Sequence, residues 1–320
     1  MRLKHIFLIT IAILTLLSCK SQKVNEDTSV AEDVVTQVVN FDGGRAYGLV
    51  KTQCDFGPRV PGTSAHGKCA QWLEQSLRQS CDTGIVQQGQ VTTFDGKTLE
   101  IKNFVGSFNP GNSDRILLLA HWDCRPWADN DPDPAKQREP VMGANDAASG
   151  VAVLLELARL MKEKRPNIGV DILLVDAEDW GTNDVEESWA LGTQYWAKHP
   201  HVEGYTAQFG ILLDMVGAKG AKFYKEYESM QFAPTVVNEV WSVAQRSGYG
   251  AYFDSNFGGG VTDDHVVVNA MGIKCIDIID TRQDGGFFAG WHTTSDTLDW
   301  IDKDVLKAVG QVVANVVYSY

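Results

Sequence analysis

The sequence is poor in basic residues. Its 320 residues include 28 Lys and Arg against 41 Asp and Glu, and the formal net charge at pH 7 is -13. A protein that binds nucleic acid without sequence preference needs a basic stripe on its surface, and this chain shows none. The charge balance therefore argues against a nucleic-acid partner.

Cysteine is also scarce. The 6 cysteines lack the paired spacing of a Cys-based structural zinc site, which argues against such a site. Export would permit a disulfide between Cys69 and Cys81, but pairing does not follow from the sequence. A Gly-x-Ser-x-Gly elbow is missing as well, so Ser149 is interpreted as the close-packed start of a helix and not as a hydrolase nucleophile.

The apolar run at the N-terminus, residues 6–17, is too short to span a bilayer as a helix. It follows basic residues, as in a secretory signal peptide, and the sequence Leu-Leu-Ser-Cys at residues 16–19 resembles a bacterial lipobox. We therefore predict a signal peptide over residues 1–18, lipidation of Cys19 and a polar tether over residues 19–40. An ordinary cleaved signal peptide and a short anchor are the alternatives. The prediction implies an exported lipoprotein, periplasmic or outer-membrane-associated, whose membrane contact is its lipid.

The sequence does contain enough apolar residues for a sizeable core, since 44% of it is hydrophobic. Unbroken aliphatic runs are typical of parallel strands covered on both faces. Such runs occur at residues 116–120, 169–175 and 209–213. Residues 85–94 and 99–108 flank an Asp-Gly turn and predict an antiparallel hairpin.

Helical patterns alternate with these strands. Helices are predicted over residues 41–53, 63–80, 149–162, 191–198, 234–247 and 304–318, and a further strand over residues 274–279. The alternation predicts a single α/β domain over residues 41–320, in which a central, mixed but mostly parallel β-sheet is flanked by helices.

Acidic residues and one histidine follow the predicted strands, at the rim where α/β sheets place their chemistry. They are His121, Asp123, Glu178, Asp179 and Asp214, while Asp146 precedes a helix. A lone Asp at a strand end is usually a cap or turn residue. Asp146, Asp179 and His292 together, however, can give one zinc ion three ligands and leave a position open for substrate. Glu178, next to a ligand, is then in the position of a general acid/base.

Five separated motifs carry a family resemblance. HWD, GANDAASGVA, the acid pair at 178–179, LLDMVGA and WHTTSDTLD stand in the order and spacing of the zinc aminopeptidase superfamily, which the chain resembles from about residue 41 to its end. HWDCRPWADND, GGVTDDH and the Trp291-His292 pair are more similar to animal-type glutaminyl-peptide cyclotransferases, in particular to their bacterial relatives. These enzymes convert the N-terminal Gln of peptides to pyroglutamate.

The resemblance implies one zinc ion per chain, held by Asp146, Asp179 and His292. Asp179 departs from the wider superfamily, which commonly has Glu there. It also implies that zinc acts as a Lewis acid on the γ-carbonyl of the substrate, and that Glu178 moves a proton from the α-amine to the departing ammonia.

Further roles come from the same resemblance. Asp214 and Asp263 are expected to lie hydrogen-bonded around the zinc site, where like charge raises the proton affinity of Glu178. The pair Asp264-His265 is the alternative to Asp263. Trp291 is expected to wall the substrate pocket; Trp180 and Trp189 are weaker candidates for this role, interpreted as ordinary packing residues.

Two other functions remain open at this stage. In a two-zinc aminopeptidase, His121 and Asp214 would bind the second ion and Asp146 would bridge the two; with one zinc, His121 and Asp123 would instead be supporting groups. The third possibility is a lipoprotein that keeps the fold but only binds peptide or carbohydrate. The presence of every candidate ligand together with Glu178 argues against it.

Overall fold

The computed structural model describes residues 39–282 and 286–320. The predicted signal peptide over residues 1–18, the lipidated Cys19 and nearly all of the tether over residues 19–40 lie outside the described residues. Within the described part, no helix is both long enough and apolar enough to cross a bilayer.

A six-stranded mixed sheet forms the centre of the domain, in the order β1-β2-β4-β3-β5-β8. Its strands are β1 (Thr83–Thr92), β2 (Thr98–Phe108), β3 (Arg115–His121), β4 (Gly169–Val175), β5 (Phe209–Leu213) and β8 (Cys275–Ile278). β2 pairs antiparallel with β1 and with β4, whereas the pairs β3–β4, β3–β5 and β5–β8 are parallel. The predicted single α/β domain with a mixed, mostly parallel sheet is confirmed, including its hairpin.

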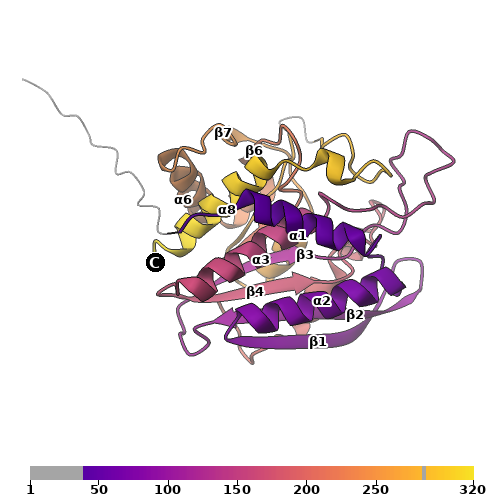
Figure 1. The fold of residues 1–320 in the computed structure, drawn as a ribbon. Coiled ribbons are helices and arrows are strands. Elements are labelled where there is room, and N and C mark those ends of the chain that lie inside the picture. The colour runs from indigo at the N-terminus through magenta and orange to yellow at the C-terminus, as the bar shows by residue number, and fades with distance from the viewer. Residues whose placement is uncertain (1–38, 283–285) are drawn as a thin grey trace, which may run out of the picture. The chain divides into compact units, whose positions relative to one another are not determined.

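Helices cover both faces of this sheet (Figure 1). One face carries α1 (Gly43–Asp55), α2 (Ser64–Ser80), α3 (Ala148–Glu163), α6 (Pro234–Arg246) and α8 (Lys303–Val317), and the other carries α4 (Leu191–Lys198) and α7 (Asp264–Ala270). Alternate residues of β3 serve the two faces: Ile116 and Leu118 belong to one core cluster, Leu117 and Leu119 to the other. This double burial explains the unbroken aliphatic runs.

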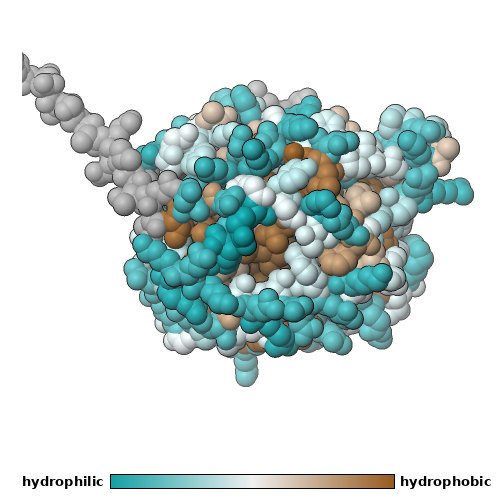
Figure 2. Space-filling view, viewed as in Figure 1, coloured by the Kyte–Doolittle hydropathy of each residue, from teal (hydrophilic) through white to brown (hydrophobic). Residues whose placement is uncertain are grey.

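The structure also contains elements that the sequence did not predict. They are the short parallel pair β6 (Phe223–Lys225) and β7 (Phe253–Phe257), the helix α5 (Tyr227–Phe232) and two 3-10 turns, Glu186–Ser188 and Leu298–Trp300. In β7 only Phe253 is buried, so no apolar alternation marks the strand. The side of the molecule seen in Figure 2 is mostly hydrophilic, with apolar side chains showing in patches between the charged ones.

The five cysteines of the described residues are free thiols. Cys69 is buried in α2, and Cys81 is the residue that caps the C-terminus of the same helix. The disulfide that the sequence left open is therefore not formed.

Close contact between α3 and β5 positions the rim of the sheet. A side chain at Gly150, in the first turn of α3, would put its Cβ 2.0 Å from the carbonyl oxygen of Leu213, the last residue of β5. Ser149 supports the contact, because its hydroxyl donates to the carbonyl of Asn145 (2.5 Å) and accepts from the amide of Val216 (3.0 Å). This agrees with the interpretation of Ser149 as a packing residue, and it brings the segment before α3 beside the end of β5.

Candidate functional site

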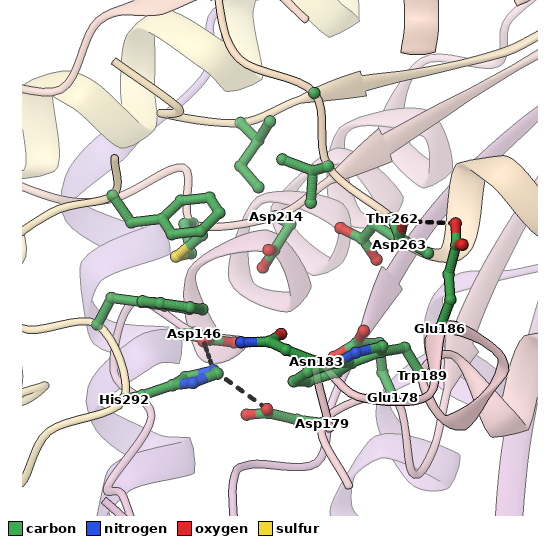
Figure 3. Close-up of a pocket in the computed structure, with 16 residues that line it drawn as sticks. Asp146, Glu178, Asp179, Asn183, Glu186, Trp189, Asp214, Thr262, Asp263 and His292 are labelled. Atoms are coloured by element: carbon green, nitrogen blue, oxygen red, sulfur yellow. Dashed lines mark hydrogen bonds and ion pairs between the residues drawn. The ribbon is translucent and has the colours of Figure 1, made fainter. Parts of the chain in front are cut away.

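A cavity of about 410 Å³ opens at the rim where β4, β5 and β8 end (Figure 3). The residues predicted for the one-zinc site within the described part all line it: Asp146, Glu178, Asp179, Asp214, Asp263, Trp291 and His292. Its remaining walls include Trp189, Met215, Val261, Ile279 and Phe287. Segments far apart in the chain therefore meet in one concave site, with carboxylates at its base and apolar side chains around them.

Asp146, Asp179 and His292 form a group that can hold a metal ion. One ligand atom of each lies within 4.8 Å of the others, and all three residues are buried. His292 Nε2 lies 3.2 Å from Asp179 Oδ1 and 3.7 Å from Asp146 Oδ2. Among the described residues, the buried Asp179 Oδ2 has no hydrogen-bond partner. An unpartnered buried carboxylate oxygen beside an imidazole and a second carboxylate fits the donor set of zinc.

Buried carboxylates hold the backbone around this group. Asp296 accepts hydrogen bonds from the amides of Asn145 (2.9 Å) and Asp146 (3.1 Å). Asp123 does the same for Glu178 (3.1 Å) and the residue after it (3.3 Å). Burial, followed by the charge of Asp146, raises the pKa of Asp296 to about 8. These bonds orient the loops that present the candidate ligands.

Arg125 and Asp129 belong to the same site, although the sequence did not predict them as site residues. The Arg125 guanidinium donates to both carboxylate oxygens of Asp129 (2.7 and 2.6 Å) and to the side chain (3.3 Å) and backbone carbonyl (3.2 Å) of Asp179. Asp129 Oδ1 lies 3.7 Å from His292 Nδ1. Burial raises the pKa of Asp129, but the hydrogen bond from Arg125 and the positive charge of Arg125 together outweigh burial and hold this pKa below its ordinary value. One guanidinium thus supports two candidate ligands.

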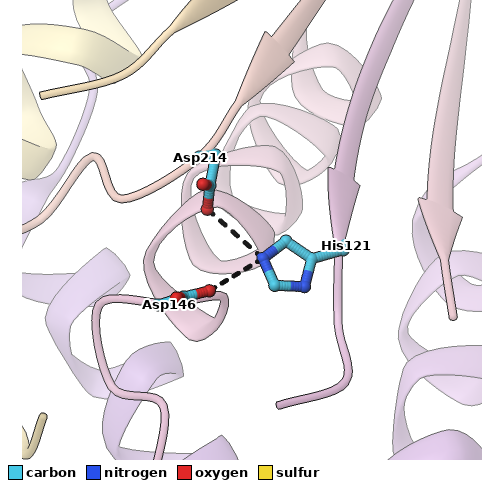
Figure 4. Close-up of side chains that lie close together, drawn as sticks. All are labelled: His121, Asp146 and Asp214. Carbon is cyan, nitrogen blue, oxygen red and sulfur yellow. Dashed lines mark hydrogen bonds and ion pairs between the residues drawn. The ribbon is translucent and has the colours of Figure 1, made fainter. Parts of the chain in front are cut away.

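A second group of side chains can also hold a metal ion (Figure 4). His121 Nε2 lies 3.0 Å from Asp146 Oδ1 and 3.3 Å from Asp214 Oδ1. Burial lowers the pKa of His121, but the hydrogen bonds that its imidazole donates to the surrounding carboxylates, together with their charge, outweigh burial and raise this pKa well above its ordinary value. Asp146 is a member of both groups. The structure therefore brings together the residues named for one zinc and those named for the two-zinc alternative.

Glu178 lies in a buried acidic environment. Burial raises the pKa of Glu178 well above its ordinary value; the imidazole of His121 lowers it, and the carboxylate of Asp263 raises it further. Burial, followed by the charge of Asp146, also raises the pKa of Asp214 to about 7. Asp263 lines the cavity, whereas Asp264, which follows it, is wholly buried and does not. Of the two alternatives, Asp263 is the one that faces the cavity.

Two tryptophans flank the imidazole of His292. The ring of Trp291 stacks on it with centroids 3.9 Å apart, and also contacts Phe287 at 4.4 Å. The ring of Trp189 lies nearly parallel to the imidazole of His292, with ring centroids 6.2 Å apart and an interplanar angle of 19°. Trp189, one of the two weaker candidates for the pocket wall, therefore lines the cavity, although it was interpreted as a packing residue. Trp180 packs against Trp127 and does not line it.

Left-handed backbone conformations cluster at the site. Six of the described non-glycine residues have positive φ, and four of them are at the site: Ala177 (φ 51°), Ala190 (φ 55°), Met215 (φ 48°) and His292 (φ 54°). The first three are sequence neighbours of Glu178, Trp189 and Asp214. Such conformations are uncommon outside glycine and gather at functional sites, where the surrounding packing holds them.

Comparison with known proteins places the chain in a family. The model of peptidase family M28 matches residues 103–317. The solved structure of a Bacteroides thetaiotaomicron glutaminyl cyclase is 47% identical, with a TM-score of 0.87 over 88% of this chain and 99% of that one. A Zn-dependent exopeptidase from Parabacteroides distasonis is 48% identical, with a TM-score of 0.87 over 88% and 100% of the two chains.

A more distant similarity extends to animals. A glutaminyl-peptide cyclotransferase from Drosophila melanogaster is 26% identical over 77% of this chain and 72% of its own length. The chain therefore belongs to peptidase family M28 and shares the zinc aminopeptidase-like fold of bacterial glutaminyl cyclases.

Proposed function

We propose that this protein is a glutaminyl-peptide cyclotransferase, which converts the N-terminal Gln of peptides and proteins to pyroglutamate with release of ammonia. The observation that carries the proposal is the arrangement of the cavity: a metal-binding group, a buried Glu178 beside it and aromatic walls. The identity and almost complete coverage shared with a bacterial glutaminyl cyclase support it.

The family and its exopeptidase neighbours imply zinc. Asp146, Asp179 and His292 would hold it, and we propose one ion per chain. When bound, zinc draws electron density from the γ-carbonyl of the substrate and stabilises the negative charge that develops on its oxygen.

Glu178 is assigned the proton transfer. The α-amine nitrogen forms a bond to the side-chain amide carbon (Cδ) of the same residue, and the bond from that carbon to the side-chain nitrogen (Nε2) breaks. Glu178 takes the proton that the amine loses and gives it to the departing nitrogen, which leaves as ammonia. A raised proton affinity suits a group that both accepts and donates, and the like charge of Asp263 contributes to it after burial.

The aromatic walls favour cyclisation over hydrolysis. Attack within one residue is intramolecular, so the protein needs to fold the Gln side chain back and to keep water away. Trp291 and Phe287 pack against each other, and Trp189 lies on the same imidazole as Trp291. A Gln side chain folded against these rings would displace water from the carbonyl.

The second candidate is a two-metal aminopeptidase. The observation in its favour is that His121, Asp146 and Asp214 also lie within metal-binding distance of one another. One experiment separates the two functions: a Gln-led peptide is incubated with the purified protein, its products are weighed by mass spectrometry, and bound metal is counted. Loss of ammonia with about one zinc per chain supports the cyclase, whereas loss of a whole residue with about two zincs supports the peptidase.

We also propose that the protein is exported and lipidated at Cys19. The proposal rests on the lipobox-like sequence at residues 16–19 after a short apolar run. The Cys19→Ala variant should move from the membrane fraction to the soluble fraction. Equal membrane recovery of both proteins would contradict lipid anchoring.

A further inference from the structure

The mouth of the cavity carries an acidic segment. Residues 183–187 are all exposed and include Asp184, Glu186 and Glu187 without a basic residue. Glu186 is the one that lines the cavity itself. This cavity also holds the buried and unpartnered Asp179 Oδ2. The acidic segment is therefore the rim of a ligand-binding cavity and not an isolated surface patch.

Glu186 is held in place by a neighbouring loop. The hydroxyl of Thr262 donates to Glu186 Oε1 at 3.0 Å, and the two residues lie together on one side of the cavity although they come from distant parts of the chain (Figure 3). The loop of Glu186 is itself braced, because the amide of Thr182 donates to the hydroxyl of Ser188 at 2.8 Å. The charge of Glu186 therefore has a defined position at the exposed edge of the cavity.

No fixed positive charge neutralises the rim. None of the residues that line the cavity is Lys or Arg, and within the described residues no ion pair joins Glu186 to either type. Arg282, on the loop after β8, does not line the cavity; its positive charge lowers the pKa of Asp280 instead. At the base, zinc and bound protons would offset the carboxylates, but at the rim the charge of Glu186 stays available to a substrate.

We propose that Glu186 selects the residue that follows the N-terminal Gln, favouring Lys or Arg and disfavouring Asp or Glu. The inference rests on the proposed function. Consecutive Cα atoms are about 3.8 Å apart, so a peptide whose first side chain occupies the base places its second residue near the rim. At a separation of about 6 Å, one charge pair in a water-rich environment changes kcat/KM by roughly threefold or more.

The test compares three peptides that differ only in their second residue, Gln-Lys, Gln-Ala and Gln-Glu, by the rate of ammonia release. Wild-type kcat/KM should fall in that order. Glu186→Gln keeps an acceptor for Thr262 but removes the charge, and should shrink the Lys-to-Glu ratio by roughly threefold or more. The matched control is Glu163→Gln. Glu163 is the last residue of α3, a helix about 24 Å long whose first turn is the end near the site, so this variant should leave the Lys-to-Glu ratio unchanged. Ionic strength near 1 M, where the Debye length is about 3 Å, should shrink the wild-type ratio as well.

The outcomes distinguish a failure of the proposed role of Glu186 from a failure of the proposed cyclase function. Ammonia release at equal kcat/KM from the Lys and Glu peptides would overturn the role of the rim while leaving cyclisation in place. A charge preference that survives Glu186→Gln would also overturn it. Absence of ammonia from all three peptides would overturn the cyclase function, and the role of Glu186 with it.

Discussion

Replacement of Arg125 by Met tests how the candidate ligands are held. The substitution keeps a long apolar side chain between Trp127 and Trp189 but removes the guanidinium that lies 5.2 Å and 5.1 Å from their ring centroids. It also removes every hydrogen bond from Arg125 to Asp129 and Asp179. We expect the variant to fold, to unfold more easily and to bind zinc more weakly.

The expected loss in the free energy of unfolding follows from the burial of the ion pair between Arg125 and Asp179. The side chains of Arg125 and Asp179 are only 4% and 2% exposed. Removal of one member of such a buried pair typically costs about 3–5 kcal/mol, because the other charge is left without a partner. Asp129 is 42% exposed, so its two bonds add little. We therefore expect a loss of about 3 kcal/mol in the free energy of unfolding and a fall of roughly 10- to 100-fold in zinc affinity.

Chemical denaturation of the metal-free protein measures the first quantity, and competition against a chromophoric zinc chelator measures the second. Arg78→Met is the matched control: Arg78 pairs with Glu74 at 2.9 Å on the exposed surface of α2, and its loss should change stability by about 0.5 kcal/mol or less. Wild-type zinc affinity in Arg125→Met, together with a stability loss no larger than that of the control, would refute the reasoning.

Three further predictions concern the proton carrier, the metal ligands and pH. Glu178→Gln should keep its zinc and lose roughly 10²- to 10⁴-fold in kcat, as expected for a lost general acid/base; metal content and rate on one preparation check this, and wild-type turnover would disprove the proton role. His292→Ala should lose zinc and activity together, whereas His121→Ala should retain about one zinc per chain; metal loss from both would favour the two-metal site. In the metal-free protein, burial raises the pKa values of Asp214 and Asp296 from 3.8 to about 7 and about 8, so the folded state binds more protons than the unfolded state between these values, and stability should fall as pH rises through this window. The melting temperature with a chelator present measures this, and a rise across the window would contradict it.

The central sheet and the members of the cavity were predictable because the sequence signals are local. β3, β4 and β5 are buried on both faces, which demands unbroken aliphatic runs, and the polar residues that follow them share one rim because parallel strands end at the same edge. Asp146 and His292 come from loops instead. Their place beside Asp179 followed from the order and spacing of motifs, not from periodicity.

The sequence could not distinguish residues whose roles depend on loop geometry. Trp180 and Trp189 occupy the same loop, yet only Trp189 lines the cavity. Its ring lies against Gly181, where an added Cβ would come within 2.1 Å of it. Arg125 and Asp129 escaped notice because a contact between loop residues leaves no periodic pattern. The sequence did contain a signal, since Arg125 is the only Lys or Arg in the acid-rich stretch HWDCRPWADND.

The left-handed residues at the cavity have a consequence for attempts to improve this protein. Each such conformation at a non-glycine residue is disfavoured by about 1–3 kcal/mol, and Ala177, Ala190, Met215 and His292 all adopt it. Laboratory evolution for heat resistance would select glycine at these four positions. Glycine adopts positive φ without a steric penalty, so the substitution would raise the free energy of unfolding. The loops would then no longer hold the site residues in the arrangement that the reaction requires. A gain in thermal stability at these positions would therefore be accompanied by a lower kcat.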